Sequence, residues 1–214
     1  NKIEQLRIEV SGTNTISAIS GVDETFGIVS AKEVRVIGAT DSYARHKLTF
    51  TGNNGIDAYG NLYISYLTLD IKGEYPISSI NNKLTVTNSQ VTATNTSTGY
   101  GAAGIWANEV VLSSCDVQGG YLYNNQFLGK TGSVLATVKI LPIKQPTEFY
   151  VLGRQVNDVT INDFAAKGWT SGTMAYDYTN RKLTMKNVNI DASTANPNMV
   201  GVEAISYYHD ECEL

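Results

Sequence analysis

The stretch "GIDAYGNLYIS", residues 55–65, decides the fold, because the chain repeats its pattern several times. The variants are "GIVSAKEVRVIG" (27–38), "PISSINNKLTV" (76–86), "GIWANEVVLSS" (104–114) and "GVEAISYYHD" (201–210). Each carries an aliphatic anchor near its start, and the first four anchors are Ile28, Ile56, Ile77 and Ile105, at intervals of 28, 21 and 28 residues. After each of these four come a small residue, a turn rich in Asn, Gly or Lys, and two alternating apolar residues. Internal repetition of this kind is typical of solenoids.

Apolar residues alternate at a period of two, which predicts short strands with one buried face. A β-sandwich also has closely spaced turns, but it has no need to repeat the same residues at equivalent positions. A solenoid does, because each coil buries its apolar side only against a similar coil. The sequence therefore predicts an all-β protein whose residues 1–140 form a single-stranded, right-handed parallel β-helix. Its inward ladders are expected to hold Leu62, Ile64, Leu84, Val86, Val110 and Leu112.

The last third of the chain follows a different pattern. Pro142 and Pro146 are unsuited to the middle of a strand ladder, so residues 141–147 are predicted to be a linker. Beyond it, "EFYVLGRQV" (148–156) and "GTMAYDYTNRKLTM" (172–185) predict hairpin strands, the second with a turn at Asp177–Asn180.

The phrase "KLTVTNSQVTA" (83–93) recurs without a gap as "KLTMKNVNIDA" (182–192), with identical residues at five of the eleven positions. In the first occurrence it forms part of the predicted coils. Its return predicts that the coil pattern resumes, so residues 148–214 are expected to hold a β-hairpin region and the start of a further coil unit.

This C-terminal phrase resembles repeat units of secreted or surface-displayed parallel β-helix proteins of gut bacteria. Those units combine a "G-x-Q-V" turn with a "Y-D-x-x-T-N-x-L-T-L-x-N-x-x-I" segment. The matching residues here are Leu152, Gly153, Gln155, Val156, Tyr176, Asp177, Thr179, Asn180, Leu183, Thr184, Asn187 and Ile190. "LRIEVSGTNTI" (6–16) also resembles a coil of such a unit. The resemblance implies an extracellular or bacterial cell-surface protein of the adhesin or carbohydrate-binding type, and it carries over no catalytic residue.

Composition excludes several classes of partner. The net charge is −4, and no Lys/Arg cluster provides the basic surface that nucleic acid requires. No apolar run approaches the roughly 20 residues of a membrane-spanning helix, so membrane insertion is not expected.

The first residues, "NKIEQLRIEV", predict a strand, and an export signal is therefore expected to be absent from this chain. The two cysteines, Cys115 and Cys212, are too few for a disulfide framework or a zinc site and are expected to be inert thiols.

The sequence argues against an enzyme. Lyases and hydrolases built on β-helices need clustered or paired carboxylates. The residues predicted to face outward after the first four anchors are Val29, Asp57, Ser78 and Trp106, which include a single acid. His46 and His209 lie near no repeated acid. We expect no catalytic residue, no metal site and no cofactor.

Aromatic residues give the better functional prediction. Alternation places Tyr63 and Trp106 outside the coils, where an exposed ring suits stacking on a sugar or a protein interface. The loop at residues 119–132 is the strongest candidate for a ligand-contacting insertion. The candidate ligand-binding residues are Trp106, Tyr63, Asp57, Tyr59, Tyr66, Tyr121 and Tyr123. The opposing interpretation is that these rings pack against the loops 39–47 and 118–133.

Three functions follow in order of preference. The first is an extracellular, non-catalytic binding module for a glycan or host surface ligand, and the second is a structural spacer of a surface array. A polysaccharide lyase or glycoside hydrolase is the least favoured. Both ends of the chain also resemble coils that lack a neighbour, which predicts head-to-tail self-association. In the alternative, residues 148–180 fold back as a cap over one end.

Overall fold

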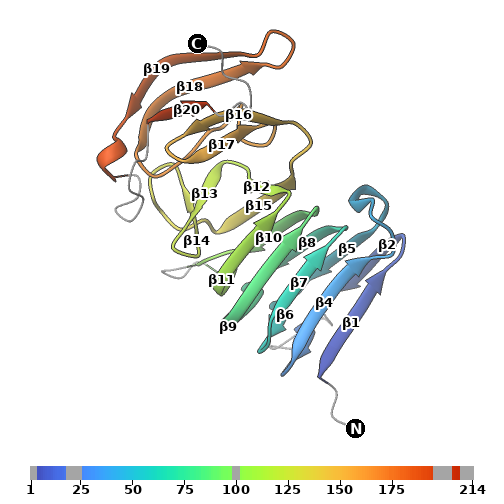
Figure 1. The fold of residues 1–214 in the computed structure, drawn as a ribbon. Coiled ribbons are helices and arrows are strands. Elements are labelled where there is room, and N and C mark those ends of the chain that lie inside the picture. Colours follow the sequence, from blue (N-terminus) through green and yellow to red (C-terminus); the bar gives the residue numbers. More distant parts are fainter. Residues whose placement is uncertain (1–3, 18–25, 98–101, 195–203, 208–214) are drawn as a thin grey trace.

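The computed structural model describes residues 4–17, 26–97, 102–194 and 204–207. Its N-terminal part is a parallel β-solenoid whose strands stack into three walls, called the β6, β7 and β8 walls after one strand of each (Figure 1). The β6 wall contains β3 (Phe26–Ser30), β6 (Asn54–Ala58), the first part of β9 (Tyr75–Thr87) and the start of β11 (Ile105–Ser113). The β7 wall contains β1 (Gln5–Val10), β4 (Glu33–Gly38), β7 (Leu62–Ser65) and the later parts of β9 and β11. The β8 wall contains β2 (Thr13–Ser17), β5 (Lys47–Thr51), β8 (Thr68–Gly73) and β10 (Gln90–Asn95).

The repeated phrase lies in register from coil to coil, which confirms the predicted solenoid. On the β6 wall the four anchors Ile28, Ile56, Ile77 and Ile105 pair in sequence. On the β7 wall the pairing runs through Val34, Leu62, Leu84 and Val110, and through Val36, Ile64, Val86 and Leu112. Leu62, Ile64, Leu84 and Val86 are fully buried, so the coils are joined by continuous apolar ladders.

The parallel stacking ends earlier than the sequence predicts. On the β8 wall, β15 (Thr137–Pro142) pairs antiparallel with both β10 and β12 (Cys115–Val117), and it lies between them. The sequence predicted that residues 137–140 belong to a parallel coil. They instead form a strand that runs back, antiparallel to β10. They still contribute to the solenoid core, because Val138 and Ile140 are fully buried.

The chain returns through a hairpin of β13 (Gly120–Tyr123) and β14 (Gln126–Gly129). Asn124 and Asn125 form its turn with positive φ angles of 46° and 62°. Asn is one of the few residues that adopt this left-handed conformation readily, and two such residues in sequence suit a tight hairpin turn.

Most of the predicted linker at 141–147 is also strand. Leu141 and Pro142 belong to β15, and Pro146 begins β16 (Pro146–Val151). Proline is tolerated here because these two residues lie at strand ends, where a missing N–H interrupts no continuous ladder.

Both predicted hairpins are present in the C-terminal part. β16 pairs antiparallel with β17 (Arg154–Asn157), and Leu152 and Gly153 turn between them with φ angles of 52° and 74°. β18 (Trp169–Asp177) pairs antiparallel with β19 (Lys182–Ile190).

The predicted start of a further coil unit is not formed by these strands. The copied phrase lies largely in β19, which pairs only with β18 in the described chain. β20 (Ile205–Tyr207) pairs antiparallel with β16 and forms the third strand of that small sheet. The predicted features at residues 195–203 and 208–214 lie outside the described residues.

The C-terminal strands form a second core around Val151, Val156, Phe164 and Trp169. Figure 1 shows these strands beyond β12 and β15, at the opposite end of the molecule from β1. Residues 148–180 thus lie at one end of the solenoid, as the cap interpretation predicted.

Candidate ligand-binding wall

Exposed apolar side chains gather on the β6 wall and its corners. Five of the nine exposed large apolar residues in the described chain lie there: Val29, Tyr59, Tyr75, Ile80 and Trp106. Tyr59 and Tyr75 are 60% and 56% exposed, and Trp106 is 40% exposed. Rings this exposed do not stabilise a core, so the wall offers free aromatic surface to a ligand.

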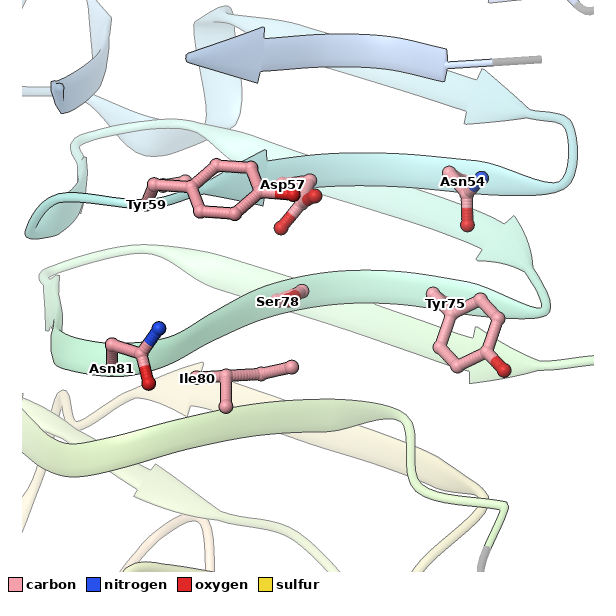
Figure 2. Close-up of a pocket in the computed structure, with 8 residues that line it drawn as sticks. Asn54, Asp57, Tyr59, Tyr75, Ser78, Ile80 and Asn81 are labelled. Atoms are coloured by element: carbon pink, nitrogen blue, oxygen red, sulfur yellow. The ribbon is translucent and has the colours of Figure 1, made fainter. Parts of the chain in front are cut away.

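A shallow hollow of about 240 Å³ lies over β6 and β9 on this wall (Figure 2). Its lining consists of Asn54, Asp57, Ala58, Tyr59, Tyr75, Ser78, Ile80 and Asn81. Two of the sequence candidates, Asp57 and Tyr59, are therefore together in one site.

Strand pairing fixes the arrangement of the hollow. Asn54 pairs with Tyr75 at one end, and Asp57 pairs with Ser78 near the middle. Ala58 is buried, so Asp57 and Tyr59 on either side of it project from the same outer face. Figure 2 shows Tyr59 and Tyr75 at opposite ends of the hollow. The five-residue offset from Asn54 to Tyr59 corresponds to about 16 Å along a strand.

Trp106 lies beside this hollow and is not part of its lining. It pairs with Ser78, which pairs with Asp57, so Trp106 is two strands away from Asp57 along the solenoid axis. Two strand spacings amount to about 10 Å. Trp106 is thus available to a ligand that extends beyond the hollow across β11.

The Asp57 carboxylate is not neutralised by its surroundings. No Lys or Arg lines the hollow. Nearby cations on the β7 wall are already paired, Lys83 Nζ with Glu109 at 2.6 Å and Arg35 Nε with Glu33 at 2.7 Å. Asp57 takes part in none of the ion pairs found among the described residues. The lining of the hollow therefore contains one carboxylate and no cationic side chain.

Tyr63 and Tyr66 are candidates that the structure separates from the hollow. Tyr63 lies on the β7 wall, where the Arg35 guanidinium covers its ring at 4.4 Å from the centroid. Tyr66 occupies the corner after β7 with a positive φ of 59°. A ligand in the hollow does not meet these two rings, because they belong to the next face of the solenoid.

The loop 119–132 packs against the C-terminal part of the chain. Tyr121 is only 7% exposed and packs with Leu128 and Ala165. The Tyr123 hydroxyl accepts a hydrogen bond of 2.8 Å from Lys167 Nζ. Tyr121 is therefore not available to a ligand, because its ring is buried within the loop and against the C-terminal part of the chain.

Six of the lining residues were not among the ligand-binding candidates predicted from the sequence: Asn54, Ala58, Tyr75, Ser78, Ile80 and Asn81. Strict alternation from the anchor Ile77 would turn Tyr75 inward. Tyr75 instead lies at the corner between the β8 and β6 walls, where its N–H and that of Glu74 both donate to the Asn53 carbonyl. Corner residues do not follow the period of two, so no sequence pattern indicated this ring.

His46 and Cys115 have structural surroundings. His46 is buried; its Nδ1 accepts from the Gly12 N–H, and its Nε2 lies 2.7 Å from Thr40 Oγ1. Burial raises the pKa of the Cys115 thiol above its ordinary value, with hydrogen bonds from the Ser89 and Asn88 backbone opposing the shift.

Within the described ranges no group of three or more His, Cys, Asp and Glu side chains is placed to hold a metal ion. The described part of the chain also contains no helix long and apolar enough to span a membrane.

Neither a family model, nor a curated protein, nor a solved structure matches the chain. The function of the β6 wall must therefore follow from its geometry and chemistry.

Proposed function

We propose that this protein is a non-catalytic binding module that holds a saccharide in the hollow of the β6 wall. The observation that carries the proposal is the pair of exposed rings, Tyr59 and Tyr75, at the two ends of an open hollow that also contains several polar side chains. Tyrosine rings offer a flat apolar face with a polar edge, which matches the faces and hydroxyl groups of a sugar. Asp57, Asn54 and Asn81 add the few directional polar groups that orient a ligand.

The place of action that goes with this proposal is the outside of a bacterial cell. The motifs shared with surface β-helix proteins support that location. An open wall also suits a large glycan, because the exposed surface continues from the hollow across β11 to Trp106.

The acidic side chain in the outward row of the β6 wall, Asp57, favours binding of a saccharide over its hydrolysis. Hydrolysis of a glycosidic bond ordinarily uses two carboxylates on either side of the bond. The outward row of the wall places Val29 and Ser78 on the two strands next to Asp57. One carboxylate can orient a sugar, but it lacks the second acid that this reaction needs.

Glycan-array screening followed by calorimetry tests the proposal. Tyr59→Ala and Tyr75→Ala should each weaken binding by roughly 3- to 10-fold, since an aromatic contact contributes about 0.5–1.5 kcal/mol. Tyr43→Ala, which changes a ring beside the β8 wall, is the matched control and should leave affinity unchanged. Wild-type protein that binds no glycan, or variants that bind equally well, would contradict the proposal.

The structural spacer is the second candidate, and the regular stacking of the coils favours it. Continuous buried ladders such as Leu62, Leu84 and Val110 make a stiff rod whatever the outer face binds. A correctly folded protein with flat binding data on every glycan would support this function in place of the first.

A further inference from the structure

The hollow on the β6 wall combines a carboxylate with aromatic rings. The Asp57 carboxylate projects from the same face as the Tyr59 ring, which lies two residues further along the chain, just past the end of β6 (Figure 2). Ser78, the strand partner of Asp57, is largely buried. It offers a ligand only its hydroxyl group. The remaining polar lining consists of neutral amides, from Asn54 and Asn81, and the tyrosine hydroxyls.

We propose that the hollow selects an amine-bearing saccharide, an oligomer of hexosamine with free amino groups, and that Asp57 binds its ammonium group. This inference rests on the proposed saccharide-binding function and names the class of sugar. A protonated amino group forms a charge-assisted hydrogen bond with a carboxylate, which is stronger than a bond between neutral groups.

The charges around the hollow exclude the opposite class of sugar. A uronic acid or a sulfated sugar would bring a second negative charge next to Asp57, with no Lys or Arg in the lining to offset it. Lys83 and Arg35, on the adjoining wall, are held by Glu109 and Glu33. Like charges at close range disfavour binding, so the hollow discriminates against acidic glycans.

The rings add to the preference for a cation. An ammonium group within about 6 Å of a tyrosine face is attracted by the negative face of the ring. Tyr59 is exposed and lies on the same face as Asp57, so a sugar stacked on this ring brings its amino group toward the carboxylate. A neutral acetylated amine gains neither interaction and keeps only the stacking and the amide contacts.

The length of the hollow calls for an oligomer. Tyr59 and Tyr75 lie about 16 Å apart along the strand direction, a span longer than a single sugar ring. An oligomer that stacks on both rings passes over Asp57 between them (Figure 2).

Calorimetry with two matched probes tests this inference: a glucosamine tetramer and the fully N-acetylated tetramer. The wild-type protein should bind the free-amine tetramer about tenfold more tightly at low salt and slightly acidic pH, where the amines are protonated. The preference should fall as salt is raised and as the pH passes above the pKa of the sugar amines.

Asp57→Asn is the decisive variant, because it preserves shape and removes the charge of an outward side chain. It should remove most of the preference for the free-amine tetramer, leaving only the smaller part that the tyrosine rings contribute, and leave the affinity for the acetylated tetramer unchanged. Asp70→Asn, on the β8 wall, is the matched control and should preserve the preference. Thermal unfolding of both variants checks that the fold is retained.

The outcomes separate the two levels of the proposal. Equal affinities of the wild-type protein for the two tetramers, or a preference that is undiminished in Asp57→Asn, would overturn the role of Asp57 and leave saccharide binding in place. Failure of wild-type protein to bind either tetramer or any array glycan would overturn both.

Discussion

The guanidinium of Arg154 lies 2.5 Å from the Asp116 carboxylate and joins the C-terminal strands to the last coil of the solenoid. The same guanidinium donates to the carbonyls of Gly120, Val117 and Ala165. Asn157 Nδ2 donates to the second oxygen of Asp116 at 2.8 Å. The two charged side chains are only 15% and 16% exposed, so this network is largely shielded from water.

Replacing Arg154 with Met should strongly destabilise the protein. The change leaves the Asp116 charge mostly buried without its cation, and breaking a buried pair costs about 3–5 kcal/mol. Urea unfolding measures the loss. Arg7→Met is the control, because its pair with Glu9 is exposed and contributes about 1 kcal/mol or less. Equal effects of the two substitutions would show that the Arg154 network does not hold the two parts together.

The apolar ladders should be sensitive to truncation. Leu84 is fully buried between Leu62 and Val110, so Leu84→Ala leaves a cavity that neighbouring coils fill poorly. We expect a loss of about 2–4 kcal/mol in the free energy of unfolding. Val111→Ala, on the outer face of the same wall, should change stability by less than about 0.5 kcal/mol. A Leu84→Ala loss as small as that of Val111→Ala would contradict the continuous ladder.

The sequence was sufficient to predict the register of the coils. Each coil buries its apolar residues against the coil before it, so Ile56, Ile77 and Ile105 had to recur at equivalent positions. The same alignment identified Asp57 and Trp106 as outward residues in one row of the wall, with Ser78 between them. Tyr75 was missed because it lies at a corner, where the backbone turns and alternation gives no direction.

The C-terminal part shows why a repeated phrase does not determine its pairing. Asn88 and Asn187 occupy the same place in the two copies, and both have positive φ angles, 41° and 53°. Asn88 turns the chain from the β7 wall to the β8 wall, whereas Asn187 lies at an irregularity in the β18–β19 hairpin. The local conformation is thus encoded by the phrase, but the partner strand is decided by the chain on either side. For the second copy this is the adjacent strand β18, joined by the turn at Asp177–Asn180.

That turn should resist mild acid. Asp177 accepts hydrogen bonds from the side chain and backbone of Asn180 and from the Thr179 N–H, and these hold the pKa of its carboxyl below the ordinary value. Because the pKa is lower in the folded state, the stabilisation is present above the unfolded pKa and is lost as pH falls through the folded pKa. An NMR titration of the Asp177 carboxyl should therefore have its midpoint below about 3.9.

Asn180→Ala provides the control for this titration. It removes the side-chain hydrogen bond, which is the largest cause of the shift, so the Asp177 midpoint should rise toward its ordinary value. A midpoint that is already ordinary in the wild-type protein, or unchanged in Asn180→Ala, would show that these hydrogen bonds do not hold the turn.

The end of the solenoid formed by β1 and β2 should mediate self-association. In the described chain, β1 pairs only with β4 and β2 only with β5, so each leaves one edge without a strand. Ile16 on β2 is 38% exposed at this end. Open edges with apolar side chains invite pairing with another chain.

We predict a geometry for that contact other than the head-to-tail stacking expected from the sequence. Head-to-tail stacking needs a coil-like C-terminal end, but β20 belongs to an antiparallel sheet with β16. We therefore predict a head-to-head contact through β1 and β2, which closes as a two-fold dimer. Light scattering across a concentration series should show monomers passing into dimers, and Ile16→Lys should shift this transition to higher concentration. Ile80→Lys, at a more exposed position on the β6 wall (61% against 38%), should leave it unchanged. Strictly monomeric wild-type protein at every concentration would contradict association through this end.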